Sequence, residues 1–368
     1  MEATQKRFDY IDWAKAIAIL CIVSGHFFPT SGIKSLLYSF HVPIFALIGG
    51  FLASAPSSGR AFGKKLGQLC LRLLVPYLIW YWVFAIPHLL PEGSISLSLI
   101  TNKPRSLKQL FEGMFFLRNE TVWNDALWFL PVYFIASVVG TFITWQSGGN
   151  RFASLIMGSA SLAGVVLMER HGITVDLFGI TNIFSMRNVF ILLGFYMLGH
   201  AARPVVARLA TLTKRRWANP VAYLSAIAFV LLATAVLDTL KVPITKWNPQ
   251  GYYALSLFGG KYNDMLNFVL YGLGLSFSLV GFCIMLPSSR FARLFSRHSF
   301  FVMLTHYAFF FVDGFTSLGS SMWQLDYALA YRDAAFINLV YWFVLLAVDK
   351  LTSRLPISKK FLRLVGFN

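Results

Sequence analysis

Residues 12–29 read DWAKAIAILCIVSGHFFP, a stretch that shows how this chain folds. It is apolar through its middle, with Asp12 and Lys15 near one end and His26 near the other. A helix needs about 20 mostly apolar residues to cross a bilayer. The stretch therefore predicts a membrane-spanning helix that carries ionisable residues toward both of its ends.

The composition of the whole chain favours the same class. Of its 368 residues, 57% are apolar and 13% are charged, whereas a soluble globular domain carries about 25% charged residues. A soluble fold of this size cannot hide so much apolar surface. Cys21, Cys70 and Cys283 lie in apolar stretches and have neither paired nor metal-ligand spacing, so we expect no disulfide framework and no metal site.

Ten stretches of the chain are apolar enough to be candidate spans. The sequence thus predicts an all-α, polytopic integral membrane protein, with one transmembrane domain over residues 1–368. The expected spans are 11–29, 33–55, 67–90, 126–145, 153–168, 185–201, 220–238, 264–286, 299–318 and 334–350.

The net charge of +17 reflects topology in this interpretation. The basic residues sit between apolar stretches, so we expect a lipid bilayer and no nucleic acid as partner. An even number of spans puts both termini on one side. With the termini in the cytoplasm, most Lys and Arg residues fall in inside segments, as the positive-inside rule requires. The longer outer segments, 91–125 and 239–263, contain Trp, Tyr, Asn and acidic residues, which suit either a sugar acceptor or a plain solvated loop.

The first expected helix carries three ionisable residues, Asp12, Lys15 and His26, whose spacing indicates which of them share a helix face. Asp12 and Lys15 are three residues apart, so they can pair on one helix face. Lys15 and His26 are about three full turns apart, or ~16 Å along the axis, and share a face. This stripe would hold a cation near the cytoplasmic end and an imidazole near the outer end. A snorkelling Lys and an interfacial His are the structural alternative.

Five further residues are candidates because polar groups inside a membrane are costly and often functional. His41 lies in the second span, where it can serve catalysis, acceptor binding or core structure. Arg72, in the third span, is of the type that binds phosphate in a bidentate manner, unless it snorkels. For Arg187 and His306, a functional role and a role in packing or ion pairing within the bundle are both open. Trp128 opens the fourth span, where an interfacial aromatic belt is the alternative.

The chain has no P-loop, dinucleotide-binding fingerprint, HExxH or GxSxG element. Histidine can act as a general base on a hydroxyl or as a covalent acyl carrier, and cations at the cytoplasmic edge can hold a phosphorylated donor. The same residues fit a proton-coupled transporter, or a flippase for a glycan or anionic substrate. A non-catalytic membrane scaffold is a third possibility. The residues alone leave these functions open.

Three stretches in order carry a resemblance to a known family. They are RFDYIDWAKAIAILCIVSGH (7–26), SFHVPIFALIGGF (39–51) and KKLGQLCLRLLVPY (64–77). Together with ALWFLPVYF, RNVFILLGFYMLGH and SRHSFFVMLTHYAFF, they resemble the acyltransferase 3 family of membrane acyltransferases. The chain looks most like the branch that O-acetylates sugars of bacterial exopolysaccharides, such as fucose or mannose acetylases.

The resemblance implies ten helices in the bacterial inner membrane and acetyl-CoA as the cytoplasmic acyl donor, with no permanently bound cofactor. It implies a glycan or lipid-linked oligosaccharide as acceptor, and polysaccharide assembly machinery as a possible partner. The family's pattern of a basic residue followed by His in the first helix falls on Lys15 and His26, although many members have Arg at the first position. Its Arg before Val-Pro falls on Arg72, and its second-helix His falls on His41.

Residues and resemblance together predict a membrane O-acetyltransferase. His26 is the expected acceptor-side base or acetyl carrier. Lys15 and Arg72 are expected to hold CoA phosphates, with Asp12 orienting Lys15. The residues expected to line the acceptor region are His41, Trp128, Arg187 and His306.

Overall fold

The computed structural model describes residues 8–27, 32–89, 107–116, 125–174, 185–212, 215–240, 265–310 and 327–354. Within these ranges every regular element is a helix, so the predicted all-α class is confirmed. The first five α-helices are α1 (Asp9–Phe27), α2 (Gly32–Phe40), α3 (Pro43–Leu52), α4 (Gly59–Leu69) and α5 (Val75–Leu89). They are followed by α6 (Leu107–Phe116), α7 (Phe129–Gln146), α8 (Arg151–Arg170), α9 (Met186–Leu209), α10 (Pro220–Leu240), α11 (Met265–Phe282), α12 (Arg290–Arg297), α13 (Ser299–Thr305) and α15 (Tyr327–Arg354).

Shorter helical turns connect or extend these elements. A π-helical turn, η1 (Cys70–Leu74), joins α4 to α5. The remaining turns are of the 3₁₀ type: η2 (Asp125–Trp128), η4 (Arg216–Ala218), η5 (Cys283–Met285) and η6 (His306–Phe310).

Eight helical segments in the described ranges are long and apolar enough to cross a membrane. The protein is therefore a polytopic membrane protein, as the sequence predicts. The expected first and ninth spans are not among these eight. The first is α1, which carries Asp12 and Lys15. Of the ninth, the structure describes the seven-residue α13 and η6, and residues 311–318 lie outside the described ranges. The total of ten spans and the cytoplasmic position of both termini stay predictions, because the eight segments are identified by length and hydropathy within the described ranges, which does not give the side of the membrane.

The second and third expected spans differ from the structure in their details. The second, 33–55, is divided into α2 and α3 by a turn at His41 and Val42. Pro43 begins α3, since its fixed φ and missing N–H suit the first position of a helix. The third, 67–90, continues a helix that already begins at Gly59.

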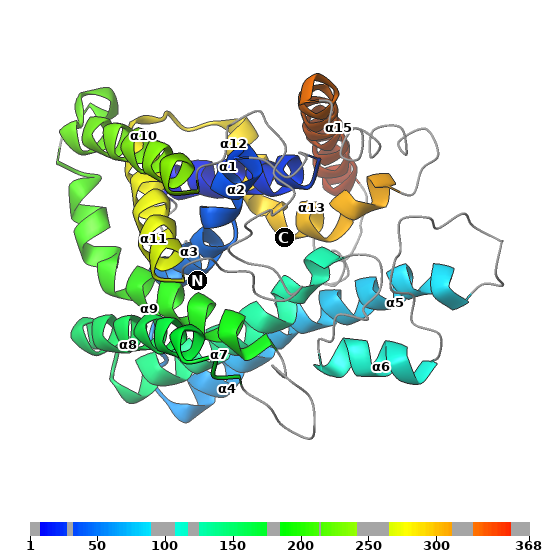
Figure 1. The fold of residues 1–368 in the computed structure, drawn as a ribbon, viewed down its shortest axis with the longest axis horizontal. Helices are drawn as coiled ribbons and strands as arrows, with labels where there is room; N and C mark the ends of the chain where they lie inside the picture. Colours follow the sequence, from blue (N-terminus) through cyan, green and yellow to red (C-terminus); the bar gives the residue numbers. More distant parts are fainter. Residues whose placement is uncertain are drawn as a thin grey trace.

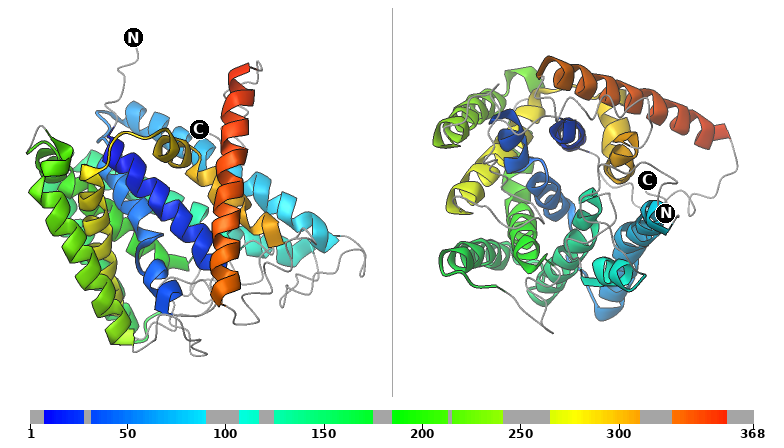
Figure 2. Two further views of the ribbon diagram at one scale, coloured as in Figure 1. Left: turned by 90° about the horizontal axis from the view of Figure 1, so that it is seen from above. Right: turned by 45° about the vertical axis from the view of Figure 1, so that its right-hand side comes forward.

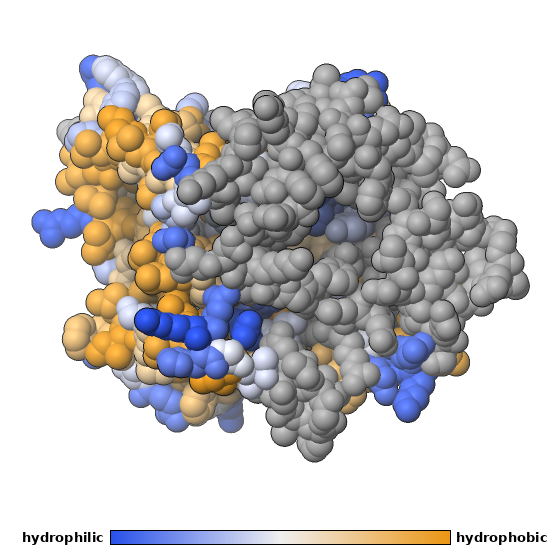
Figure 3. Space-filling model, viewed as in Figure 1, coloured by the Kyte–Doolittle hydropathy of each residue, from blue (hydrophilic) through white to orange (hydrophobic). Residues whose placement is uncertain are grey.

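Helix α1 lies in the interior of the bundle, between α11 and α15 in Figure 2. Ala14, Ala18 and Ile19 of this helix are fully buried. On the outside of the bundle, Leu224 and Leu231 of α10 are 66% and 65% exposed. Apolar residues cover the side of the molecule where α9, α10 and α11 lie (Figures 1 and 3). In a membrane protein such a surface contacts lipid.

Glycines bring α3 against α9 and α7. A Cβ atom on Gly50 would lie 1.7 Å from the Tyr196 carbonyl oxygen, and one on Gly49 would lie 1.9 Å from the Tyr133 hydroxyl. Such distances leave no room for any side chain. Small residues allow helix backbones in a membrane protein to approach this closely.

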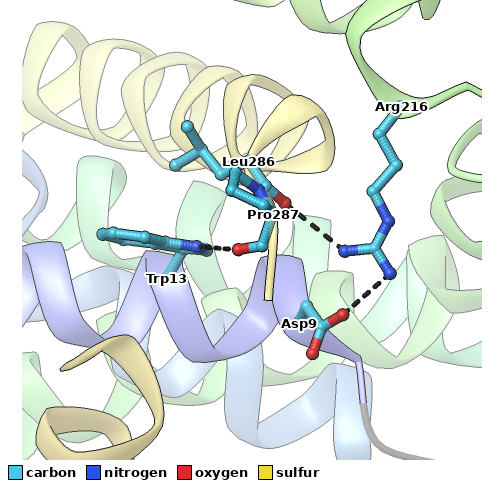
Figure 4. A network of polar contacts seen from close by, with 5 residues as sticks. All are labelled: Asp9, Trp13, Arg216, Leu286 and Pro287. Carbon is cyan, nitrogen blue, oxygen red and sulfur yellow. Dashed lines mark hydrogen bonds and ion pairs between the residues drawn. The ribbon is translucent and has the colours of Figure 1, made fainter. Parts of the chain in front are cut away.

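Polar contacts fix the amino-terminal end of α1 to the chain around η4 and η5 (Figure 4). The Arg216 guanidinium lies 2.8 Å from Asp9 and donates to the Leu286 carbonyl at 3.4 Å. Trp13 donates its indole N–H to the Pro287 carbonyl at 2.7 Å. Asp9 and Trp13 are four residues apart, so these contacts hold the first turns of α1 along one face of the helix.

Candidate active site

A small cavity brings together three of the residues predicted from the sequence. It has a volume of about 50 Å³ and is lined by Ile22, His26, Tyr38, His41, Val42, Phe45, Ala126, Trp128, Phe129 and Met303. His26 comes from the last turn of α1, His41 from the break between α2 and α3, and Trp128 from the turn before α7. The volume accommodates a few water-sized groups rather than a whole sugar.

The imidazole of His26 contacts two hydroxyls and a second imidazole. Its Nδ1 atom lies 3.0 Å from the Tyr307 hydroxyl and 3.3 Å from the Tyr38 hydroxyl. The His306 ring lies against it, with the ring centroids 4.9 Å apart. His306 does not line the cavity, but its ring packs against His26, which does. The structure therefore gathers His26, His41 and His306 at one place.

The other two imidazoles are oriented by the backbone. Nδ1 of His41 contacts the Leu37 carbonyl, and Nδ1 of His306 lies 3.2 Å from the Val302 carbonyl. A carbonyl oxygen only accepts hydrogen bonds, so Nδ1 carries the hydrogen in both rings and Nε2 carries the lone pair. Both rings are buried, at 2% and 0% exposure. Each is thus held in the tautomer whose Nε2 can accept a proton.

Lys34 is a buried cation beside this cluster that was not among the predicted site residues. Its side chain is 7% exposed, and its ammonium lies 5.7 Å from the centroid of the Tyr38 ring. Lys34, Tyr38 and His41 are spaced by four and three residues. This is the repeat of one helix face, and it is the sequence signal that could have revealed the group.

Toward the amino-terminal end of α1, Asp12 and Lys15 both contact Ser296 of α12. The Ser296 hydroxyl donates to the Asp12 carboxylate at 2.7 Å, and the Lys15 ammonium donates to the Ser296 carbonyl at 2.6 Å. Ser296 therefore contacts both members of the predicted Asp12–Lys15 pair, whose direct pairing stays a prediction. Lys15 lies about 16 Å from His26 along the helix axis, given the α-helical rise.

Arg72 lies in the π-helical turn η1, and its guanidinium is 5.1 Å from the centroid of the Phe300 ring. Single π-helical turns occur frequently at functional sites. Phe300 is four residues after Ser296, which contacts Lys15. The two predicted donor-binding cations thus meet the same short stretch where α12 gives way to α13. Arg72 belongs to the candidate membrane span Gly59–Ile86, on the surface of the described bundle.

Arg187 occupies a different place. Its guanidinium donates to the Ile173 carbonyl at 3.3 Å, near the end of α8, and Arg187 does not line the cavity. Its part in acceptor binding stays a prediction. In the part of the chain that the structure describes, no group of three or more His, Cys, Asp or Glu residues could hold a metal ion.

The fold and this cavity define a multi-pass membrane protein with a cluster of histidines at one end of its central helix. The profile of the Acyl_transf_3 family, described as an acyltransferase domain, matches residues 8–348, so the chain belongs to this family.

Two curated relatives are similar over shorter stretches. One is the nodulation protein NolL of Mesorhizobium japonicum, 29% identical over 112 residues, which make up 26% of this chain and 30% of that protein. The other is the nodulation protein NolL of Sinorhizobium fredii, 32% identical over 80 residues, or 19% of this chain and 22% of that protein. In both matches the chain spans less than a third of the relative's length. No solved structure matches the chain.

Proposed function

We propose that this protein is an O-acetyltransferase of the bacterial inner membrane. It moves an acetyl group from cytoplasmic acetyl-CoA to a sugar hydroxyl of a lipid-linked or exported polysaccharide. Membership of an acyltransferase family supports the reaction class. The acetyl donor, the glycan acceptor and the particular membrane are parts of the proposal.

The observation that carries this proposal is the layout of α1. A single buried helix bears Lys15 near one end and His26 near the other, and a cavity opens at the His26 end. The separation of about 16 Å along one face suits a donor whose charged part and reactive end are joined by an extended arm. CoA, with its phosphates and its thioester, is such a donor.

The reaction at His26 follows from the chemistry of imidazole. The Nε2 lone pair takes the proton of the acceptor hydroxyl while the hydroxyl oxygen attacks the thioester carbonyl carbon. A new C–O ester bond forms, the C–S bond breaks, and the proton on His26 passes to the CoA sulfur. The products are an O-acetyl sugar and free CoA thiol. Transfer through an acetyl-histidine intermediate gives the same products.

The remaining residues support the two ends of this transfer. Lys15 and Arg72 supply positive charge to the CoA phosphates, and Asp12 orients Lys15 with the help of Ser296. On the acceptor side, His41 and Trp128 line the cavity. The small volume fits the reacting hydroxyl and acetyl group, so the rest of the glycan lies outside it and can stay bound to the polysaccharide assembly machinery.

Membranes from the source cell, with and without this protein, test the proposal. With acetyl-CoA labelled in its acetyl group, we expect label in the polysaccharide and an equal amount of CoA thiol, both dependent on the protein. A flippase or transporter would move a glycan or an anion without releasing thiol from acetyl-CoA. Absence of both products would refute the proposal.

A further inference from the structure

The hydroxyl of Tyr307 lies 3.0 Å from Nδ1 of His26. Tyr307 falls within the stretch SRHSFFVMLTHYAFF that carries the family resemblance, but no role was predicted for it. Tyr307 belongs to η6 and is 281 residues from His26 in the chain. Its hydroxyl faces the Nδ1 atom of the imidazole. We propose that Tyr307 is a positioning residue: its hydroxyl oxygen accepts the Nδ1 hydrogen of His26 and so leaves Nε2 as the basic nitrogen. This inference rests on the proposed function of His26.

The comparison with the neighbouring imidazoles explains why a tyrosine is needed here. His41 and His306 have their Nδ1 atoms on backbone carbonyls, which fix their tautomers. For His26 the partner is a hydroxyl, which can donate or accept, and the ring can therefore adopt either tautomer. General base catalysis at the cavity requires the lone pair on Nε2. Tyr307 must then act as the acceptor, as the third group does in a nucleophile–histidine–acceptor arrangement.

A Tyr307 hydroxyl that accepts from Nδ1 also remains a suitable partner while Nε2 of His26 takes up and releases a proton. When Nε2 takes the proton of the acceptor hydroxyl, Nδ1 keeps its hydrogen, so the bond to Tyr307 persists in the imidazolium. A hydroxyl that donated to Nδ1 would stabilise the opposite tautomer, in which Nε2 is protonated and cannot act as a base. Tyr38, at 3.3 Å, approaches the same nitrogen from α2 with the longer contact.

The chain offers a matched control in Tyr341. This tyrosine lies on α15, is 2% exposed, and places its hydroxyl 2.8 Å from Thr305 rather than next to an imidazole. Tyr307→Phe and Tyr341→Phe each remove one tyrosine hydroxyl, and the partner of Tyr341, Thr305, is only two residues before Tyr307 in the chain. Only the first removes a partner of His26.

Kinetics of the purified full chain in vesicles that contain the cell's own polysaccharide give the first test. For Tyr307→Phe we expect turnover about 10- to 100-fold lower, because a loosely oriented base loses part of its effect, with the KM for acetyl-CoA within about twofold of wild type. Tyr341→Phe should keep its turnover. Wild-type turnover in Tyr307→Phe, with His26→Gln inactive, would overturn this inference and leave the proposed function standing.

The tautomer itself gives a second test that needs neither turnover nor a known acceptor. In ¹⁵N-histidine-labelled protein in nanodiscs, the His26 ring signals are those missing from His26→Gln. Near neutral to alkaline pH we expect the Nδ1–H tautomer in wild type and its loss in Tyr307→Phe. An Nε2–H tautomer in wild type would overturn the role of Tyr307. Full transfer activity in His26→Gln would instead overturn the proposed function of His26, and this role of Tyr307 with it.

Discussion

The two ends of α1 are held in different ways. At the amino-terminal end, Asp9 pairs with a guanidinium, while Trp13 and Lys15 donate to backbone carbonyls. At the other end, His26 meets hydroxyls and aromatic rings beside a cavity. Charged contacts with fixed carbonyls anchor a helix, whereas imidazoles and hydroxyls exchange protons. The difference teaches that one helix can be anchored at one end and carry groups able to exchange protons at the other, as the proposed transfer requires.

The largest expected effect lies at the reactive end. His26→Gln keeps a polar side chain of similar size but cannot take up a proton, so we expect acetyl transfer to fall by about 10²- to 10⁴-fold. Binding of CoA should be unchanged. The measurement is transfer of labelled acetyl groups into the polysaccharide fraction. The control is His171→Gln, a substitution at an exposed turn after α8.

A His26→Gln variant with normal acetyl transfer would contradict the proposed contrast between the two ends of α1. It would show that His26 serves only in packing or hydrogen bonding. The base would then have to be sought at His41 or His306, whose Nε2 atoms carry the lone pair.

The next effect concerns donor binding. Arg72→Lys keeps the charge but loses the planar guanidinium that binds phosphate through two hydrogen bonds. We expect CoA to bind more weakly by ~1–3 kcal/mol, the usual range for a charged hydrogen bond. Titration of CoA into the purified variant measures this loss. Arg60→Lys, an exposed position on α4, is the matched control, and equal CoA affinities in both variants would make Arg72 a structural residue.

The smallest effect on transfer is expected at Ser296, which anchors α1. Ser296→Ala removes the hydroxyl that donates to the Asp12 carboxylate, which is 8% exposed. Removing a partner of a buried charge costs ~1–3 kcal/mol, so we expect a lower melting temperature of the purified protein with transfer largely kept below it. Thr234→Ala removes an exposed hydroxyl from α10 and should leave the melting temperature unchanged. Unchanged stability in Ser296→Ala with lost transfer would instead place Ser296 at the donor.

Much of the fold could be predicted, because long apolar runs have few ways to satisfy their backbone in a membrane. The helical repeat alone placed Lys15 and His26 on one face. The break at His41 was not predicted, although Pro43 signals a helix start. The π-helical turn around Arg72 was also missed, since packing rather than composition decides where a helix takes up an extra residue.

The candidate site was predicted only in part. The histidines stood out as ionisable groups in apolar stretches, and three of them do meet. That they meet depends on how α1, α2 and η6 pack, which one sequence does not reveal. Tyr38 and Tyr307 were missed because tyrosines are unremarkable among so many aromatic residues. Residues 91–106, 117–124 and 241–263 of the expected outer segments lie outside the described residues, so their part in acceptor binding stays a prediction.

The central claim is that α1 links a donor end in the cytoplasm to a transfer end at the other face. Sealed membrane vesicles of both orientations, given labelled acetyl-CoA only on the outside, test it most directly. We predict that inside-out vesicles, which present the cytoplasmic face, incorporate label into their polysaccharide in a His26-dependent manner, and that right-side-out vesicles do not. Equal labelling in both orientations, or labelling in right-side-out vesicles alone, would contradict the account.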